Sequence, residues 1–209
     1  MAHQSLLENN WLCLNFVNSV DLRLSVRDES LHSYKDVVAW GRQQGVITDA
    51  ETALLLDKAT ARPGEAIAAY RLAIALREVL YRIFSAVIHE KQVPAADLTA
   101  FNAVLAEEAA PTQLIQTEGG LTCRWLDRKG ELGWPLAPIA RSAVALLTSE
   151  SLDRLRECPG SPGRACGWLF VDMTKNRSRQ WCVGGLCGNR TRALRHYERG
   201  RKQAAVDSP

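Results

Sequence analysis

The sequence predicts a mainly α fold with a small β-hairpin (α+β): a helical N-terminal domain, residues 1–150, followed by a small C-terminal module, residues 151–209. Two observations carry this prediction. Apolar residues recur at helical spacing through most of the first 150 residues. Four of the six cysteines then gather near the C-terminal end, where the charge also changes sign. Residues 1–150 carry 14 Lys and Arg against 18 Asp and Glu, whereas residues 151–209 carry 12 against 5.

The first elements of the N-terminal domain are expected to be short helices. Apolar residues at helical spacing start at Leu12, although a strand stays an alternative for so short a run. Ser33 and Asp36 have the spacing of a helix cap, and the helix that they open is expected to stop near Gly45. The segment Thr48-Asp-Ala-Glu51 repeats the signal for a second helix.

A longer periodic segment follows Pro63-Gly64, and its apolar stripe runs from Leu76 to Ile88 as one core-facing side. A further helix is expected over residues 95–109. The pattern then changes to two short strands, residues 114–117 and 121–126, joined by a glycine turn. Helical spacing resumes over residues 139–147, a short helix is expected over 152–156, and residues 158–163 are too rich in Pro and Gly for either period.

The clustered cysteines form two pairs, Cys158-x7-Cys166 and Cys182-x4-Cys187. Two thiolate pairs are what a tetrahedral structural Zn²⁺ needs, so we expect one structural zinc ion. Disulfides and redox-active thiols are the alternatives. No basic segment followed by an apolar run opens the sequence, so a reducing, cytoplasmic location is expected, where clustered cysteines more often hold metal. Cys13 and Cys123 stand singly among apolar residues and are expected to be small buried side chains.

The rest of the C-terminal module completes a treble-clef-like zinc finger in this interpretation. Residues 167–172 are expected to form a strand of a hairpin that packs over the metal. The following segment, Lys175 to Trp181, places cations at alternating positions, which share one face if the segment is extended. A helix is expected from Gly188 to Lys202, where backbone N–H groups at its start favour the nearby thiolate.

This last helix carries a basic stripe. Arg192, Arg195, Arg199 and Lys202 recur at i, i+3, i+7 and i+10, and nine cations stand against one acid between Lys175 and Lys202. A solvated basic surface is the plain explanation, but phosphate contact is favoured, so nucleic acid is the leading partner. The expected contacts are Lys175, Arg177, Arg179, Arg190, Arg192, Arg195, Arg199 and Lys202. For Arg190, bracing the zinc site and touching phosphate stay open.

No group of residues in 1–150 has the spacing of a catalytic site. His32 and His89 lie far apart and have no nucleophile or carboxylate motif nearby, and Gly119-Gly120 falls in the expected hairpin instead of a phosphate-binding loop. The longest apolar runs are too short to cross a bilayer. We therefore expect neither an enzyme nor a membrane protein.

Three segments of the module, Cys166 to Asp172, Lys175 to Cys182 and Cys187-Gly-Asn-Arg190, resemble the CGNR zinc finger. The segment Trp11 to Asn18 and the helical body resemble the ABATE domain that usually precedes it. The resemblance implies zinc ligation by Cys158, Cys166, Cys182 and Cys187. It departs from the family at the first pair, which usually has a tighter spacing than x7 and makes Cys158 the least secure ligand.

The resemblance also implies a bacterial transcription regulator, often linked to stress, with a finger that binds DNA. In our leading hypothesis the helical body senses an effector or forms a homodimer. The alternative is a zinc finger that docks an acidic partner protein without touching DNA. The sequence names no effector, operator or oligomeric state.

Overall fold

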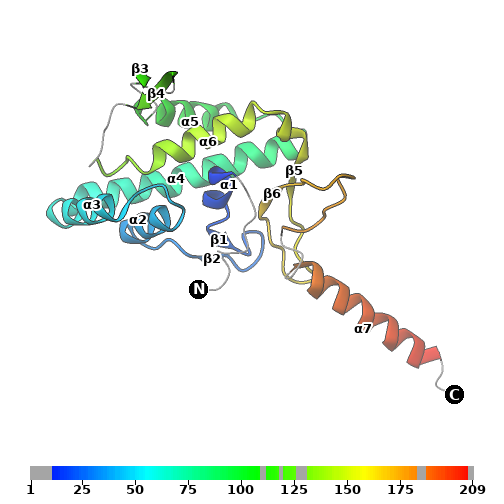
Figure 1. Ribbon diagram of the computed structural model, residues 1–209. Coiled ribbons are helices and arrows are strands. Elements are labelled where there is room, and N and C mark those ends of the chain that lie inside the picture. Colours follow the sequence, from blue (N-terminus) through cyan, green and yellow to red (C-terminus); the bar gives the residue numbers. More distant parts are fainter. Residues whose placement is uncertain (1–10, 109–111, 118–119, 126–130, 183–186, 207–209) are drawn as a thin grey trace.

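The computed structural model describes residues 11–108, 112–117, 120–125, 131–182 and 187–206 of the 209. Figure 1 shows a helical body, a small hairpin on its edge and a long helix that leaves it at the C-terminal end. The elements are α1 (Leu12–Val17), β1 (Val20–Asp21), β2 (Asp28–Glu29), α2 (Tyr34–Gln43), α3 (Asp49–Ala61), α4 (Pro63–Ile88), α5 (Ala95–Glu108), β3 (Thr112–Thr117), β4 (Gly120–Trp125), α6 (Leu136–Leu147), a 3₁₀ helix (Glu150–Arg154), β5 (Leu155–Glu157), β6 (Leu169–Val171) and α7 (Asn189–Val206). The mainly α class with small antiparallel hairpins is as predicted.

Helix α4 is the centre of the body. It packs against α1, α2, α3, α5 and β5, and its 26 residues span about 39 Å at 1.5 Å per residue. The predicted apolar stripe is its buried side: Leu76, Leu80, Ile83 and Phe84 are almost wholly enclosed. This face therefore organises the main core, as the helical spacing predicted.

The predicted helix starts are confirmed by their caps. The Ser33 hydroxyl accepts a hydrogen bond from the Asp36 N–H at the start of α2. At the start of α3, the Thr48 hydroxyl accepts from the Glu51 N–H, and the Glu51 carboxylate accepts from the Thr48 N–H in return. Each cap pairs backbone groups that have no partner inside the helix.

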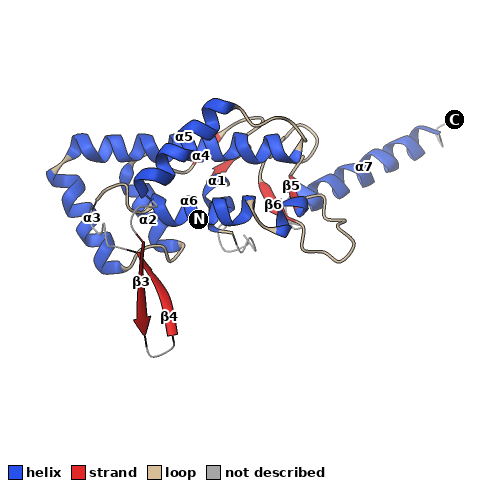
Figure 2. Ribbon diagram, turned by 90° about the horizontal axis from the view of Figure 1, so that it is seen from above, coloured by secondary structure: helices blue, strands red, loops and turns tan. Residues whose placement is uncertain are grey.

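The hairpin between α5 and α6 is also confirmed. Strands β3 and β4 pair antiparallel from Thr112 opposite Trp125 to Thr117 opposite Gly120, and in Figure 2 they project from the body as an isolated ribbon. Of the two single cysteines, Cys13 is fully buried, and burial raises its pKa to about 12. The side chain of Cys123 lies outside the part that the structure describes.

Two predictions beyond α6 are only partly correct. The helix expected over residues 152–156 is a 3₁₀ turn that ends at Arg154, and Leu155–Glu157 is strand β5. The strand expected over 167–172 exists as β6, but it pairs with β5 and not with the segment after it. Residues 155–157 are a strand and not a helix because the extended backbone buries the Leu155 side chain completely in the core.

The segment from Lys175 to Trp181 is therefore not the second strand of a hairpin. A turn over residues 174–177 follows β6 after two residues, and Arg177 takes a left-handed backbone conformation with φ 50°. The buried Asp172 carboxylate fixes this turn, since it accepts hydrogen bonds from the Thr174 N–H, the Thr174 hydroxyl and the Arg179 N–H. The idea that the cations alternate on one extended face does not hold here.

Strands β5 and β6 belong to the core of the body. Leu155, Leu169 and Val171 are buried in the same cluster as the apolar sides of α1, α4 and α6. The Asn18 side chain, just after α1, donates to the Leu169 C=O and accepts from the Leu169 N–H, both at 2.8 Å. This paired contact closes one edge of β6 and joins the two ends of the sequence.

A partly buried ion-pair network, centred on the fully buried Arg77, anchors β1 and β2 beside this junction. Arg77 of α4 has no exposed surface and binds the Glu29 carboxylate of β2 with two hydrogen bonds of 2.7 and 2.5 Å. Glu78 pairs with Arg23 at 2.5 Å and with Arg27 at 2.8 Å, both on the connection between β1 and β2. The connection is thereby tied to the central helix.

Within the described residues, none of the helices is both long enough and apolar enough to cross a membrane.

Candidate metal centre

The structure brings the four clustered cysteines together. Cys158 follows β5, Cys166 precedes β6, and Cys182 and Cys187 come just before α7. Their sulfur atoms all lie within 4.8 Å of one another, and the Sγ atoms of Cys166 and Cys182 are 3.9 Å apart. A tetrahedral site with Zn–S bonds of about 2.3 Å needs sulfur atoms about 3.8 Å apart. The separations fit one zinc ion.

Burial and charge at this site also favour a metal. Cys158, Cys166 and Cys182 are buried, and Cys187 is half-buried. Hydrogen bonds from Cys166 lower the pKa of Cys158, whereas the hydrogen bond to Cys158 raises the pKa of Cys166. Without a metal, some of these cysteines are therefore protonated thiols that donate hydrogen bonds and others are thiolates that accept them. Four thiolates so close together would repel one another. A divalent cation removes that conflict and favours all four thiolates.

The long first loop reaches the metal through a nested turn. Ser161 and Arg164 exchange two backbone hydrogen bonds of 3.1 and 2.8 Å, which takes up the extra residues between Cys158 and Cys166. Gly160 makes this turn with φ 80°, and a Cβ atom there would lie 2.1 Å from the Arg164 carbonyl oxygen. The x7 spacing is thus compatible with ligation, and Cys158 sits in the sulfur cluster with the other three.

The ends of this loop extend the pairing of β5 with β6. The Cys158 N–H donates to the Trp168 C=O at 2.8 Å, and the Gly167 N–H donates to the Cys158 C=O at 3.0 Å. The Trp168 indole N–H donates to the Val20 C=O of β1 at 2.8 Å. The first cysteine pair is therefore positioned by the hairpin and by the body together.

Trp181 connects the first cysteine loop to the start of α7. Its indole N–H donates to the Gly160 C=O at 3.1 Å. Its ring lies against Gly188, where a Cβ atom would come within 3.3 Å of a ring carbon. Glycine at this position allows the tryptophan to pack closely beside Cys187. The Thr191 hydroxyl donates to the Cys187 C=O at 2.8 Å and closes the first turn.

Arg179 points into the module. Its half-buried guanidinium donates to the Trp181 C=O at 2.9 Å and to the Cys182 C=O, and it lies over the Phe170 ring with 4.8 Å to the centroid. The sequence predicted Arg179 as a nucleic-acid contact, together with the other cations of its segment. Nothing in the alternating positions of these cations indicates that the Arg179 side chain points into the module. The structure places its head group against the backbone of Cys182, one of the four clustered cysteines.

The other predicted contacts lie on the outside. Arg177 pairs with Asp153 at 2.7 Å, and Lys175 is exposed. Arg190, Arg192, Arg195 and Arg199 are exposed along α7, and the side chain of Lys202 lies outside the described part. Arg192 also donates to the Asn189 side chain at 2.9 Å and lies 5.8 Å from the centre of the Trp181 ring. The beginning of the stripe is thus fixed to the metal site.

Helix α7 extends away from the body in both Figure 1 and Figure 2, with the C-terminus at its far end. Its 18 residues span about 27 Å. Thr191 near its start is buried, while Arg195, Tyr197 and Arg199 further along are exposed. The stripe is therefore presented to solvent over most of the helix.

Sequence reasoning missed the contacts that join this module to the body. Asn18, which holds Leu169, and Val20, which accepts from Trp168, lie about 150 residues before their partners. Neither carries a local signal, because a single asparagine and a backbone carbonyl have no characteristic spacing. An alignment of related sequences is the kind of signal that reveals such pairs.

Two family models match the chain. The model of the ABATE family, described as "Putative stress-induced transcription regulator", matches residues 10–150. The model of the CGNR zinc finger matches residues 154–200, which include all four clustered cysteines. Among curated proteins, none matches this chain.

Proposed function

We propose that this chain, which belongs to the ABATE family and carries a CGNR zinc finger that can hold one zinc ion, regulates transcription by binding DNA along α7. The observation that carries the proposal is the exposed stripe of Arg192, Arg195 and Arg199, which projects from the metal centre. Like charges three and four residues apart destabilise an isolated helix by a few tenths of a kcal/mol per pair. Contact with phosphates turns that cost into binding free energy.

The cations predicted to contact DNA divide into three groups in this proposal. Arg190, Arg192, Arg195 and Arg199 contact the DNA backbone from α7, with Lys202 beyond them. Lys175 and Arg177 are exposed on the turn after β6, and Asp153 partly neutralises Arg177. Arg179 supports the cysteine loop and contributes to DNA binding only by holding the module in shape.

The zinc ion has a structural task here. It joins the loop after β5, the approach to β6 and the start of α7, so that α7 leaves the body in a fixed direction. Four sulfur ligands leave no open position for a water or a substrate, which supports a protein that is not an enzyme. A reducing cytoplasm suits such thiolates. The helical body senses an effector or forms a homodimer in this proposal.

Fluorescence anisotropy with random-sequence duplex DNA tests the proposal. Binding through about five phosphates predicts a slope of about −4 to −5 when log affinity is plotted against log salt concentration. Replacing Arg192, Arg195 and Arg199 together by alanine lowers the affinity and flattens the slope by about 3.

The matched control removes three exposed cations from the body, Lys35, Arg71 and Lys91, and leaves the salt slope as in the wild type. Zinc content measured on each variant checks that the finger is intact. If the zinc-loaded wild type binds no duplex DNA even at low salt, the proposal fails and the acidic-protein partner becomes the better explanation of the stripe.

A further inference from the structure

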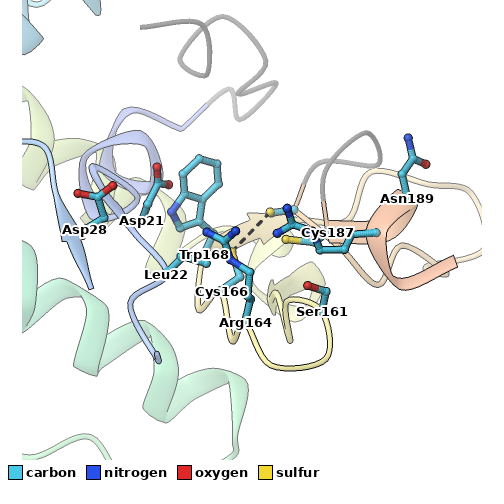
Figure 3. A pocket seen from close by; sticks show the side chains of 11 residues that line it. Asp21, Leu22, Asp28, Ser161, Arg164, Cys166, Trp168, Cys187 and Asn189 are labelled. Carbon is cyan, nitrogen blue, oxygen red and sulfur yellow. Dashed lines mark hydrogen bonds between the residues drawn. The ribbon is translucent and has the colours of Figure 1, made fainter. Parts of the chain in front are cut away.

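A pocket of about 740 Å³ lies on the helical body, where the start of α2, the end of α3 and the first turns of α4 come together. Its volume is within the range of small-molecule sites, about 300–1,000 Å³. Figure 1 shows these three segments at the opposite end of the body from β5, β6 and α7. The pocket is therefore separate from the hollow in Figure 3, which is lined by three of the clustered cysteines and belongs to the metal centre.

Much of the wall of this body pocket is apolar. Leu56 and Ala59 come from α3, and Pro63, Ala66 and Ile67 come from α4. Ile67 is 52% exposed, although a side chain of this size and polarity is usually buried in a core. Apolar side chains left open to solvent within a concave surface are typical of ligand sites.

The uncharged polar groups of the wall already have partners inside the protein. The Tyr34 hydroxyl donates to the Leu132 C=O at 2.8 Å, and the Tyr70 hydroxyl donates to the Leu31 C=O at 2.9 Å. The two tyrosines therefore offer a ligand their rings and not their hydroxyl protons. The remaining hydroxyl groups of the wall also donate within the chain, those of Ser33 and Thr60.

Three basic side chains complete the wall, those of His32, Lys35 and Arg71. All three are exposed, and none of them forms a side-chain hydrogen bond or ion pair in the described part of the chain. No carboxylate lines the pocket among the described residues. The Asp36 carboxylate, in the first turn of α2, accepts from the His32 N–H and the Ser33 hydroxyl. The charge that the wall offers to a ligand is therefore positive.

The basic groups are placed toward one end of the pocket. Because the Tyr70 hydroxyl reaches the Leu31 C=O, the turn of α4 that carries Arg71 lies beside the segment that enters α2 through His32. Pro63, which also lines the pocket, lies about 12 Å away along the axis of α4. A ligand that fits this wall has an anionic group at one end and an apolar body.

The same wall disfavours strongly polar anions. Inorganic phosphate has no apolar part to cover Ile67 and the tyrosine rings. A nucleotide or a sugar phosphate would lose hydration from its hydroxyl and amide groups, and the engaged hydroxyls of the wall would not replace those hydrogen bonds.

We infer that this pocket binds a small carboxylic acid with an apolar body, either aromatic or aliphatic. Lys35 and Arg71 bind the carboxylate, and the apolar body covers Ile67 and the rings of Tyr34 and Tyr70. This class of effector rests on the sensing role proposed for the body. Its binding is measured without DNA, so a chain that binds DNA but no acid contradicts this inference alone, and the reverse result contradicts DNA binding alone.

Isothermal titration of the zinc-loaded full chain with octanoate, decanoate and naphthoate tests the inference. At least one of these acids binds with one site per chain. The amide of that acid, which keeps the shape and lacks the charge, binds at least about tenfold more weakly. Acetate, which keeps the charge and lacks the apolar body, also binds at least about tenfold more weakly.

Single substitutions assign the two parts of the ligand. Lys35→Gln and Arg71→Gln each weaken the acid about fivefold and leave the amide unchanged, because each removes one exposed charge. Ile67→Ser weakens the acid and the amide alike, because it removes apolar contact. Lys91→Gln, at an exposed lysine beyond the end of α4 and outside the pocket, is the matched control and binds as the wild type does.

The substituted side chains are exposed, so the variants keep the fold, and circular dichroism during heating checks this. The inference is overturned if none of the three acids binds, if the amide binds as tightly as the acid, or if the pocket variants bind the acid as the Lys91→Gln control does.

Discussion

Arg177 and Arg179 show how two neighbouring cations in one basic segment acquire different tasks. Both were predicted to contact nucleic acid, because they alternate along a segment that is rich in positive charge. The left-handed conformation of Arg177 turns the chain, so its side chain meets Asp153 at the surface. Arg179 follows the turn and points inward to the Cys182 carbonyl. The sequence gives the charge of each residue, but it does not give the direction in which the side chain points.

Replacing Arg179 by alanine is expected to weaken the metal site more than replacing Arg177. The Arg179→Ala change leaves the Trp181 and Cys182 carbonyls without their donor, at a cost of about 1–3 kcal/mol per buried group. Zinc transfer to a chromophoric chelator should therefore be faster for Arg179→Ala than for the wild type. The Arg177→Ala variant loses only an exposed ion pair worth about 1 kcal/mol or less. Equal transfer rates for the two variants would contradict the bracing role.

At the scale of elements, the helices were predicted correctly, whereas the pairing of the strands in the zinc module was not. The helices were predicted from periodicity and caps that lie within a few residues of each other, as at Ser33 and Thr48. The partner of β6 was predicted incorrectly, since pairing depends on which edge the rest of the fold leaves open. Asn18 closes one edge and β5 takes the other.

The nested turn in the first cysteine loop provides a matched pair of glycine variants. Gly160 and Gly163 both have positive φ, so either alanine substitution costs about 1–2 kcal/mol of backbone strain. At Gly160 the new Cβ would also meet the Arg164 carbonyl at 2.1 Å, whereas at Gly163 it meets nothing within 4 Å. We expect Gly160→Ala to lose zinc affinity by far more than Gly163→Ala in competition with a chelator. Similar losses of zinc affinity in the two variants would show that backbone strain, and not the contact with the Arg164 carbonyl, determines the effect.

The ion pair between Arg77 and Glu29 predicts a pH dependence. Burial opposes ionisation of Glu29, but hydrogen bonds from Arg77 and Leu31 outweigh it and lower the pKa from 4.5 to about 2. Because the folded-state pKa is depressed, the stabilisation is complete above the unfolded pKa and is lost as pH falls through 4.5 towards 2.

Urea unfolding of the wild type and Glu29→Gln tests this dependence. The variant leaves the buried Arg77 short of a counter-charge and should be about 3 kcal/mol less stable near neutral pH. The difference should shrink as pH falls below 4.5, since the wild type then gains the proton that removes the charge. Acid loss of zinc affects both proteins and cancels in the comparison. A constant difference across the range would refute the role of the Glu29 charge.

At the scale of the whole molecule, the zinc module and the body share one core. The sequence predicted residues 151–209 as a small C-terminal module. Leu155, Leu169 and Val171 of this module are buried with the apolar side chains of the body. Each such side chain contributes about 1.5–3 kcal/mol, and together they approach the whole stability of an ordinary domain, about 5–15 kcal/mol.

Removal of zinc should therefore destabilise the body as well as the finger. We expect the full chain to unfold in one transition whose midpoint falls when a chelator removes the metal. A fragment of residues 1–150 lacks β5 and β6 and should be much less stable than the full chain, as circular dichroism during heating would show. Two independent transitions, with the first alone sensitive to the chelator, would contradict the shared core.

The sequence by itself determined the helices of the body, the small hairpin, the four clustered cysteines that can hold a metal ion, and the basic stripe of α7. Each of these depends on residues at short, regular separations, and local physics is enough to predict them. Only the tertiary structure decided that β5 pairs with β6, that Arg179 turns inward, and that Asn18 holds the finger to the body. These contacts join residues far apart in the chain, and which of them meet is decided by how the apolar faces pack together and not by any local pattern.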